Sequence, residues 1–275
     1  MILGQVNTVF VNTKGVENII TAKLKEHRIT PLTREVKEGG TEDVGPFTLE
    51  FVAVNHSIPD ALAVVINTGA GRVLATGDFK MDQLPLDGRI TDLRTFARLG
   101  EQGVDLFMVD STNADVPGFT PSEREIMPAL NRVISSTKRR VIVASFSSHV
   151  HRVQQVIDIA AQHGRKVVFI GRSMVRNMKI AEDMGYLNVP ADLVIDAKDL
   201  DQYDDNVVLI CTGSQGEVLA GLSRIAHGQN AHIELDSTDT VVFASNPIPG
   251  NNFGIGKVID ALSKTECKVI KKIMT

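Results

Sequence analysis

Residues 51–80, FVAVNHSIPDALAVVINTGAGRVLATGDFK, organise the first half of this 275-residue chain. The stretch contains two apolar, strand-like runs, and each run ends in polar residues: NHS at 55–57 and GDFK at 77–80. An imidazole and a carboxylate at the ends of neighbouring strands are ligands that hard or borderline metal ions take in proteins. The pattern therefore predicts a metal site at His56 and Asp78.

The same two residues also have an ordinary structural interpretation. An Asp at a strand end often accepts backbone N–H bonds in a turn, and a His often caps a loop. On this alternative, His56 and Asp78 only hold their own turns. The identity of the surrounding residues, more than the pair itself, favours the metal site.

Six phrases of the sequence match a known family in unbroken order between about Ala22 and Asn251. They are AVNHSIPDA (53–61), ATGDFKMDQLPLDG (75–88), VDSTNADVPG (109–118), VIVASFSSHVHRVQQV (141–156), GRSMVRN (171–177) and TGSQGE (212–217). On these phrases the chain resembles ribonuclease J, of the β-CASP branch of the metallo-β-lactamase fold, and its actinobacterial members most closely. The resemblance implies an α/β protein with a partial metallo-β-lactamase (αββα) domain in residues 1–116. A β-CASP domain with a mostly parallel sheet would follow in residues 117–275.

The resemblance also implies an activity. Members of the family use two zinc ions to cleave RNA, both inside the strand and stepwise in the 5′-to-3′ direction, and intact members form homo-oligomers. The residue that matches His56 binds one zinc ion in the family, and the residue that matches Asp78 bridges both ions, so we expect both to be catalytic. Because two cations lower the pKa of bound water, such a site holds a hydroxide at neutral pH, which is the family's nucleophile.

A third acid, Asp110, ends another apolar run at residues 104–109 and matches the acid that the family calls motif A. By the resemblance it lies near the metals and hydrogen-bonds one of their ligands, which fixes the tautomer of that ligand. The alternative, to which we give equal weight, is an Asp that caps its own turn at Thr112.

The chain also departs from the family. The HxHxDH motif, which supplies most of the family's zinc ligands, does not occur in the sequence, and neither do the two later histidine motifs before Thr275. Residues 1–20 do not resemble the family. We therefore expect an incomplete chain that keeps two metal ligands, binds zinc weakly and has little nuclease activity, because zinc sites usually take three or four protein ligands.

Composition bounds the class of protein. With 43% hydrophobic residues, the chain can form one or two domains with an ordinary core. No apolar segment is long enough to cross a bilayer, and the N-terminus lacks the order of a secretory signal, so we expect no membrane partner. The two cysteines lie far apart in the sequence, which makes a reducing, cytoplasmic setting the default.

Charge is distributed unevenly along the chain. The formal net charge is −4, yet residues 132–179 contain ten Lys and Arg against one acid, Asp158. A face with this composition would attract a phosphate backbone, with an affinity that falls as salt rises. The alternative is that these residues are ordinary solvated ends of helices and strands. The resemblance favours RNA as the partner.

The second half of the sequence alternates between strand and helix patterns. Residues 115–118 break the chain, and TPSE at 120–123 has the form of a capping box that predicts a helix to about Ser135. The alternation that follows implies a parallel sheet covered on both faces. Predicted strands are residues 141–146, 166–170, 193–196, 207–212 and 240–245, and predicted helices are residues 148–162, 173–184 and 217–226, with Gly164, Gly185 and Gly228 at the helix ends.

Three predicted strand-to-helix turns, at residues 145–149, 171–173 and 212–216, are rich in Gly and Ser. Ligands of parallel sheets gather at the carboxyl ends of strands, where helix N-termini present free N–H groups that suit a phosphate. Small residues also permit tight turns, which is sufficient reason for any one of the three. All three on one edge favour a groove for RNA or a 5′-phosphate. The candidate RNA- or phosphate-binding residues are Ser147, Ser148, His151, Arg152, Arg172, Ser173, Arg176, Ser214 and Gln215.

Two other functions remain open from the residues alone. One is a noncatalytic RNA-binding module that uses the basic residues without a metal. The other is a small-molecule hydrolase of the metallo-β-lactamase fold, which would leave the basic window unexplained. RNA binding that persists in a chelator separates the first from the enzyme, and lack of RNA affinity leaves the second.

Overall fold

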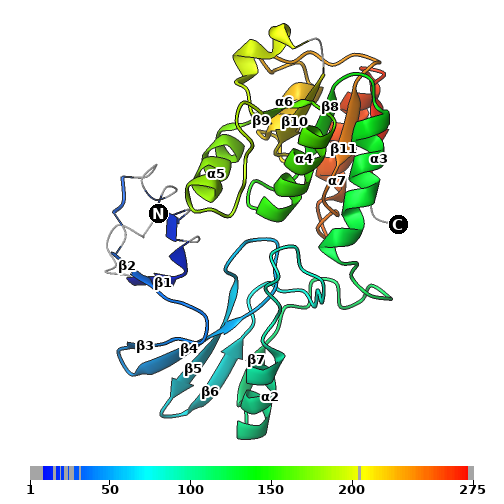
Figure 1. The fold of residues 1–275 in the computed structure, drawn as a ribbon. Coiled ribbons are helices and arrows are strands. Elements are labelled where there is room, and N and C mark those ends of the chain that lie inside the picture. Colours follow the sequence, from blue (N-terminus) through cyan, green and yellow to red (C-terminus); the bar gives the residue numbers. More distant parts are fainter. Residues whose placement is uncertain are drawn as a thin grey trace. The chain divides into compact units, whose positions relative to one another are not determined.

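The structure is a computed structural model that describes residues 9–14, 17, 18, 20, 21, 24, 28–30, 32–203 and 206–271. The chain divides into two compact units, Met1–Ser122 and Glu123–Thr275. Figure 1 shows the elements of each unit. Within the described residues, no helix combines the length and the apolar character needed to cross a membrane.

In the described part of unit 1, a sheet of five strands has the order β3-β4-β5-β6-β7 (Figure 1). Strands β3 to β6 form an antiparallel meander, and β7 pairs in parallel with β6 after a crossover through helix α2. A separate parallel pair is formed by β1 and β2. The bounds are β1 Val9–Asn12, β2 Leu32–Glu35, β3 Thr41–Val44, β4 Phe47–Ala53, β5 Leu62–Thr68, β6 Gly71–Ala75, α2 Leu93–Gln102 and β7 Leu106–Met108.

The core of unit 1 lies on one face of this sheet. Alternate residues of β4 and β5, such as Val52 and Val65, are buried there together with Leu74 of β6 and Leu99 of α2. This alternation is the expected consequence of the two-residue period of a strand. Asp92 is the N-cap of α2, and its carboxylate accepts hydrogen bonds from the backbone N and the hydroxyl of Thr95.

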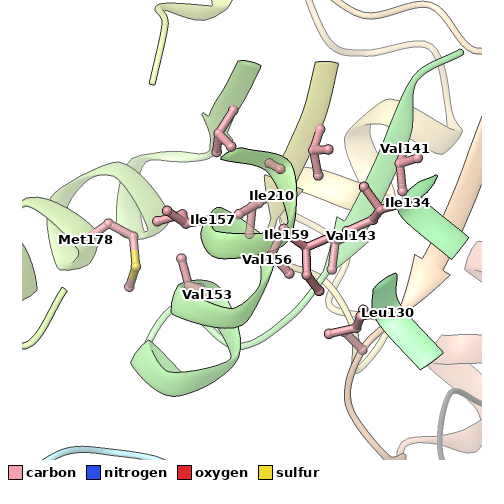
Figure 2. Close-up of a cluster of buried hydrophobic side chains, with 14 of the residues drawn as sticks. Leu130, Ile134, Val141, Val143, Val153, Val156, Ile157, Ile159, Met178 and Ile210 are labelled. Carbon is pink, nitrogen blue, oxygen red and sulfur yellow. The ribbon is translucent and has the colours of Figure 1, made fainter. Parts of the chain in front are cut away.

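In the described part of unit 2, five strands form a parallel sheet in the order β12-β11-β8-β10-β9. The prediction of a parallel sheet covered on both faces is confirmed, since α3, α4 and α5 contribute to one apolar cluster and α6 and α7 to another. Figure 2 shows the first cluster. The bounds are α3 Met127–Ser136, β8 Val141–Ala144, α4 Val150–Gln162, β9 Lys166–Ile170, α5 Arg172–Asp183, β10 Val207–Cys211, α6 Gly221–Ala226, β11 Thr240–Phe243, α7 Asn252–Ser263 and β12 Lys268–Ile270.

The helix predicted to run to about Ser135 is confirmed, and its first turn, beyond the predicted capping box at residues 120–123, is not α-helical. A 3-10 helix, η1, occupies Glu123–Ile126, and α3 begins after the apolar Ile126. The side chain of Glu123 is buried and pairs with Arg152 of α4 and with His149, the N-cap residue of that helix. A carboxylate with two buried partners has stronger interactions than one that caps a solvated helix end.

Two further differences concern the edges of the sheet. The predicted strand at 193–196 contributes only an isolated bridge between Val167 and Val194, and a 3-10 helix, η2 Ala197–Gln202, follows. Helix α7 and strand β12 were not predicted. The predicted glycine caps all have positive φ angles, as an end in the left-handed region requires.

Candidate functional site

His56 and Asp78 lie together in unit 1. The ends of their two strands are joined by an isolated bridge between Asn55 and Lys80, in which the Lys80 N donates to the Asn55 O at 2.8 Å. This pairing brings His56 Nε2 to 3.9 Å from Asp78 Oδ2. The His56 side chain is mostly buried and that of Asp78 is exposed, so both can contact a ligand from solvent.

The electrostatics of the pair suit a neutral imidazole. Burial lowers the pKa of His56 below its ordinary value, and the negative charges of Asp78 and Asp110 act in the opposite direction without reversing the shift. A neutral imidazole has the free nitrogen lone pair that a metal ion requires.

Asp110 lies beside this pair and also caps its own turn. Its Oδ1 accepts hydrogen bonds from the N and Oγ1 of Thr112, and its Oδ2 accepts one from the N of Phe79, next to Asp78. The hydroxyl of Thr112 is the main reason that the pKa of Asp110 is lowered. The capping role is therefore present in the structure, and the carboxylate is ionised next to the two candidate ligands.

The described residues do not complete a metal site. Among them, no group of three or more His, Cys, Asp or Glu side chains could hold a metal ion. A protein zinc site usually takes three or four ligands. His56 and Asp78 therefore do not form a closed zinc site by themselves.

The three Gly- and Ser-rich turns of unit 2 follow three neighbouring strands, β8, β10 and β9. Parallel strands end at the same edge of the sheet, so the turns lie on that edge. The side chain of Asn177, in α5, connects two parts of this edge because its Nδ2 donates to the O and Oγ of Ser147. Among the predicted RNA-binding residues, Arg172 is exposed, and five are half-buried: Ser147, Ser148, His151, Ser173 and Arg176.

The prediction that Arg152 faces RNA is wrong. Its side chain is 2% exposed. The guanidinium donates from Nε to Glu123 Oε1 at 2.6 Å and from Nη1 to the O of Ala244, at the end of β11. Arg152 is thus an internal residue that connects η1, α4 and the end of β11.

Two residues of the third turn are also buried. Gln215 uses its amide inside the protein: Nε2 donates to the O of Asn246, and Oε1 accepts from Ile248 N and Asn251 Nδ2. We therefore correct Gln215 from a phosphate ligand to a residue that holds the following loop. Ser214 is 2% exposed, and its hydroxyl has no hydrogen-bond partner among the described residues.

The basic window is not one continuous cationic face. Arg165 is buried and donates to backbone carbonyl groups, including that of Ile134. Arg140 pairs with the buried Asp239, and Lys179 pairs with Asp183 at 2.8 Å. Lys179 is thus a solvated helix residue, as the alternative expected, whereas Arg165 is an internal residue and not a solvated strand end.

Sequence reasoning did not predict that Glu123, His149 and Arg152 form a buried cluster, nor did it identify Asn177. His149 Nε2 lies 3.4 Å from Glu123 Oε1, close to Arg152. Burial lowers the pKa of His149 to about 4, and the charge of Arg152 acts in the same direction. One sequence signal for Asn177 existed, since it lies four residues after Ser173 and therefore on the same side of the helix.

The chain is similar in sequence to proteins named Ribonuclease J. Residues 138–262 match the family model for the β-CASP domain of ribonuclease J. The chain is 51% identical to the Ribonuclease J of Mycolicibacterium smegmatis over 261 residues, which is 94% of this chain and 47% of that protein. It is 42% identical to the Ribonuclease J of Thermus thermophilus over 248 residues, which is 89% of this chain and 43% of that protein. The chain thus spans about half the length of the curated relatives that it matches.

The fold is similar to a crystal structure described as that of a protein of unknown function from Enterococcus faecalis V583. The TM-score is 0.64 at 15% sequence identity, and the match covers 94% of this chain and 62% of the other. At this level of identity, the likeness supports the fold alone.

Proposed function

We propose that the chain is a ribonuclease J-like protein that binds RNA through the carboxyl edge of the unit 2 sheet, and the proposal is supported by the match of residues 138–262 to the β-CASP model and by the similarity to Ribonuclease J of Mycolicibacterium smegmatis. The proposal includes a role for His56 and Asp78 as zinc ligands in RNA hydrolysis. The observation that carries RNA binding is the row of three turns on one edge, together with the first turn of α5.

The N-terminus of α5 supplies the chemistry for a phosphate. The first N–H groups of a helix have no partner within the helix, and the helix dipole favours an anion there. The N-cap residue is Gly171, which has no side chain to accept those hydrogen bonds. Arg172, Ser173 and Arg176 lie on this turn and add cationic and hydroxyl donors.

RNA binding is expected to depend on salt and on Arg172. In EDTA, the Kd for a fluorescent 5′-monophosphorylated oligoribonucleotide should rise steeply between 50 and 200 mM salt, on the order of tenfold for each two or so phosphate contacts, and R172A should reduce the salt slope by about 1. Fluorescence anisotropy measures both quantities. The matched control is K179A, on the same helix, because Lys179 is already paired with Asp183. Equal effects of R172A and K179A would contradict the phosphate site.

Zinc binding by this chain is expected to be weak. His56 and Asp78 provide two ligands, and the described residues add no group of three. After dialysis, metal analysis should find well below one zinc ion per chain, and added RNA should remain largely intact. Stoichiometric zinc with RNA degradation would show that further ligands are present in the chain. H56A should lower the zinc content further. H163A is its control, since it removes a histidine of unit 2 that contacts Asn131 and leaves His56 and Asp78 unchanged.

A second candidate function is a noncatalytic RNA-binding module, which the lack of a group of three ligands within the described part of the chain favours. RNA affinity that is unchanged by EDTA and by H56A would support it. Absence of any RNA affinity would leave the small-molecule hydrolase.

We also propose that the protein is cytoplasmic and forms homo-oligomers. Cys211 and Cys267 are free and buried, in keeping with the reducing cytoplasm that we propose. The family resemblance supports homo-oligomers, and light scattering after size exclusion tests for them.

A further inference from the structure

Asn177 holds the main chain and the side chain of Ser147. Asn177 lies in α5 and is 7% exposed. Its Nδ2 is 3.2 Å from the O of Ser147 and 3.1 Å from Ser147 Oγ. Ser147 belongs to the turn after β8, so this one amide group fixes the position of that turn against α5.

The direction of these hydrogen bonds follows from their chemistry. A backbone carbonyl oxygen can only accept, so the nitrogen of the Asn177 amide, not its oxygen, faces Ser147. The same nitrogen then donates to Ser147 Oγ. A hydroxyl that accepts one bond still has its own proton to donate. Among the described residues, no acceptor takes the proton of the Ser147 hydroxyl.

The surroundings of Ser147 favour an anion as that acceptor. Asn177 is four residues beyond Ser173, so the two residues lie on the same side of α5, and Ser173 belongs to the first turn of that helix. That turn presents backbone N–H groups, and Arg172 is exposed on it. A ligand with several acceptor oxygens and negative charge suits this set of donors.

We propose that Asn177 is a positioning residue that fixes the Ser147 hydroxyl as a hydrogen-bond donor to a phosphate group of RNA. The inference rests on the proposed function, and it explains how Ser147 is oriented to donate a hydrogen bond to the phosphate. Asn177 itself is buried, its Oδ1 accepts a long hydrogen bond of 3.5 Å from Arg176 Nε, and in this proposal it acts through Ser147.

The substitution N177D tests the direction of the hydrogen bond. Asp has nearly the shape of Asn, but its carboxylate only accepts, so it would take the proton of the Ser147 hydroxyl. The donor to phosphate is then lost. We expect N177D and S147A each to raise the Kd for the 5′-monophosphorylated oligoribonucleotide about tenfold or more, as for one hydrogen bond to a charged group. S147T, which keeps the hydroxyl, should bind more tightly than S147A.

The double variant separates positioning from a general effect. If Asn177 acts through Ser147, N177D should have little further effect in the S147A background, because the hydroxyl is already gone. The control N131D introduces the same charge change on α3 of the same unit, and it should leave the Kd nearly unchanged. Anisotropy in EDTA is the readout, and circular dichroism verifies that each variant is folded.

The outcomes discriminate between the two proposals. Wild-type binding that S147A leaves unchanged overturns this inference and leaves the proposed function standing. Additive effects of N177D and S147A also overturn it, since the Asp then acts through its charge or the fold. If N177D does not fold, the comparison of S147A with S147T still decides, because equal binding by both contradicts a hydroxyl donor. Absence of RNA binding by the wild type overturns both proposals.

Discussion

Replacing Arg152 by methionine is expected to destabilise unit 2 by about 3–5 kcal/mol, because the substitution leaves the carboxylate of Glu123 buried without its cation. In the wild type, Glu123 is 7% exposed and accepts a 2.6 Å hydrogen bond from Arg152 Nε. Urea denaturation followed by tyrosine fluorescence measures the change. The chain has two tyrosines, Tyr186 and Tyr203, and no tryptophan, so the signal comes from unit 2.

The control for R152M is the double variant E123Q/R152M. It removes the charge on both partners, so it should recover a large part of the lost free energy of unfolding. R152M stability equal to that of the wild type would contradict a buried ion pair. A double variant no more stable than R152M would show that packing, not the charge on Glu123, dominates.

The effect of R152M should depend on pH. Burial alone would raise the pKa of Glu123, but hydrogen bonds from His149 and Arg152 and the charge of Arg152 hold it well below its ordinary value of 4.5. A lowered pKa contributes stability that is present above the ordinary pKa and is lost as pH falls below it. Without Arg152 the buried carboxyl group tolerates protonation, so the gap between R152M and the wild type should narrow towards pH 4.

His149 adds a second acid-sensitive contribution. Its pKa is lowered from 6.5 to about 4 by burial, so the unfolded chain binds a proton in this window that the folded chain does not. Wild-type stability should therefore decrease as pH falls from about 6.5 to 4.

Replacing Gly216 by alanine is the second change with a large expected effect, at least about 3 kcal/mol of destabilisation. A Cβ atom at this position would lie 2.1 Å from the C atom of Gly254 and 2.3 Å from the N of Ile255. Both are backbone atoms at the start of α7 and cannot move as a side chain can. Gly216 also has a φ of +76°, which disfavours alanine.

The matched control for G216A is G164A. Gly164 also has a positive φ, +61°, but a Cβ there would meet no atom within 4 Å. It should therefore show only the conformational cost, about 1–2 kcal/mol. Chemical denaturation of both variants separates the two terms. Equal destabilisation by G216A and G164A would indicate that the backbone at Gly254 shifts at little energetic cost to accommodate the added Cβ atom.

The contact at Gly216 also explains why α7 was difficult to predict. The helix packs where two glycines let two backbones touch, and Gln215 binds the loop that leads into it. Neither interaction leaves a periodic apolar pattern in the sequence. By contrast, β9 was predicted at the residues where it occurs, because its apolar run is bounded by a glycine on one side and a helix cap on the other.

Strands β8 to β11, helices α3 to α5 and the parallel pairing of unit 2 followed from local pattern, since side-chain periodicity and turn residues act within a few positions of the chain. The same pattern placed His56 and Asp78 just after strand ends. Strand β5 lies between those two strands, and the bridge between Asn55 and Lys80 brings His56 Nε2 to 3.9 Å from Asp78 Oδ2. Which arginines are exposed did not follow. Arg152 is buried by partners 29 and 92 residues away. The charge of Arg152 is visible in a short stretch of sequence, but its partners lie outside that stretch. The tertiary structure alone therefore decided its role, because the packing of distant segments buries it.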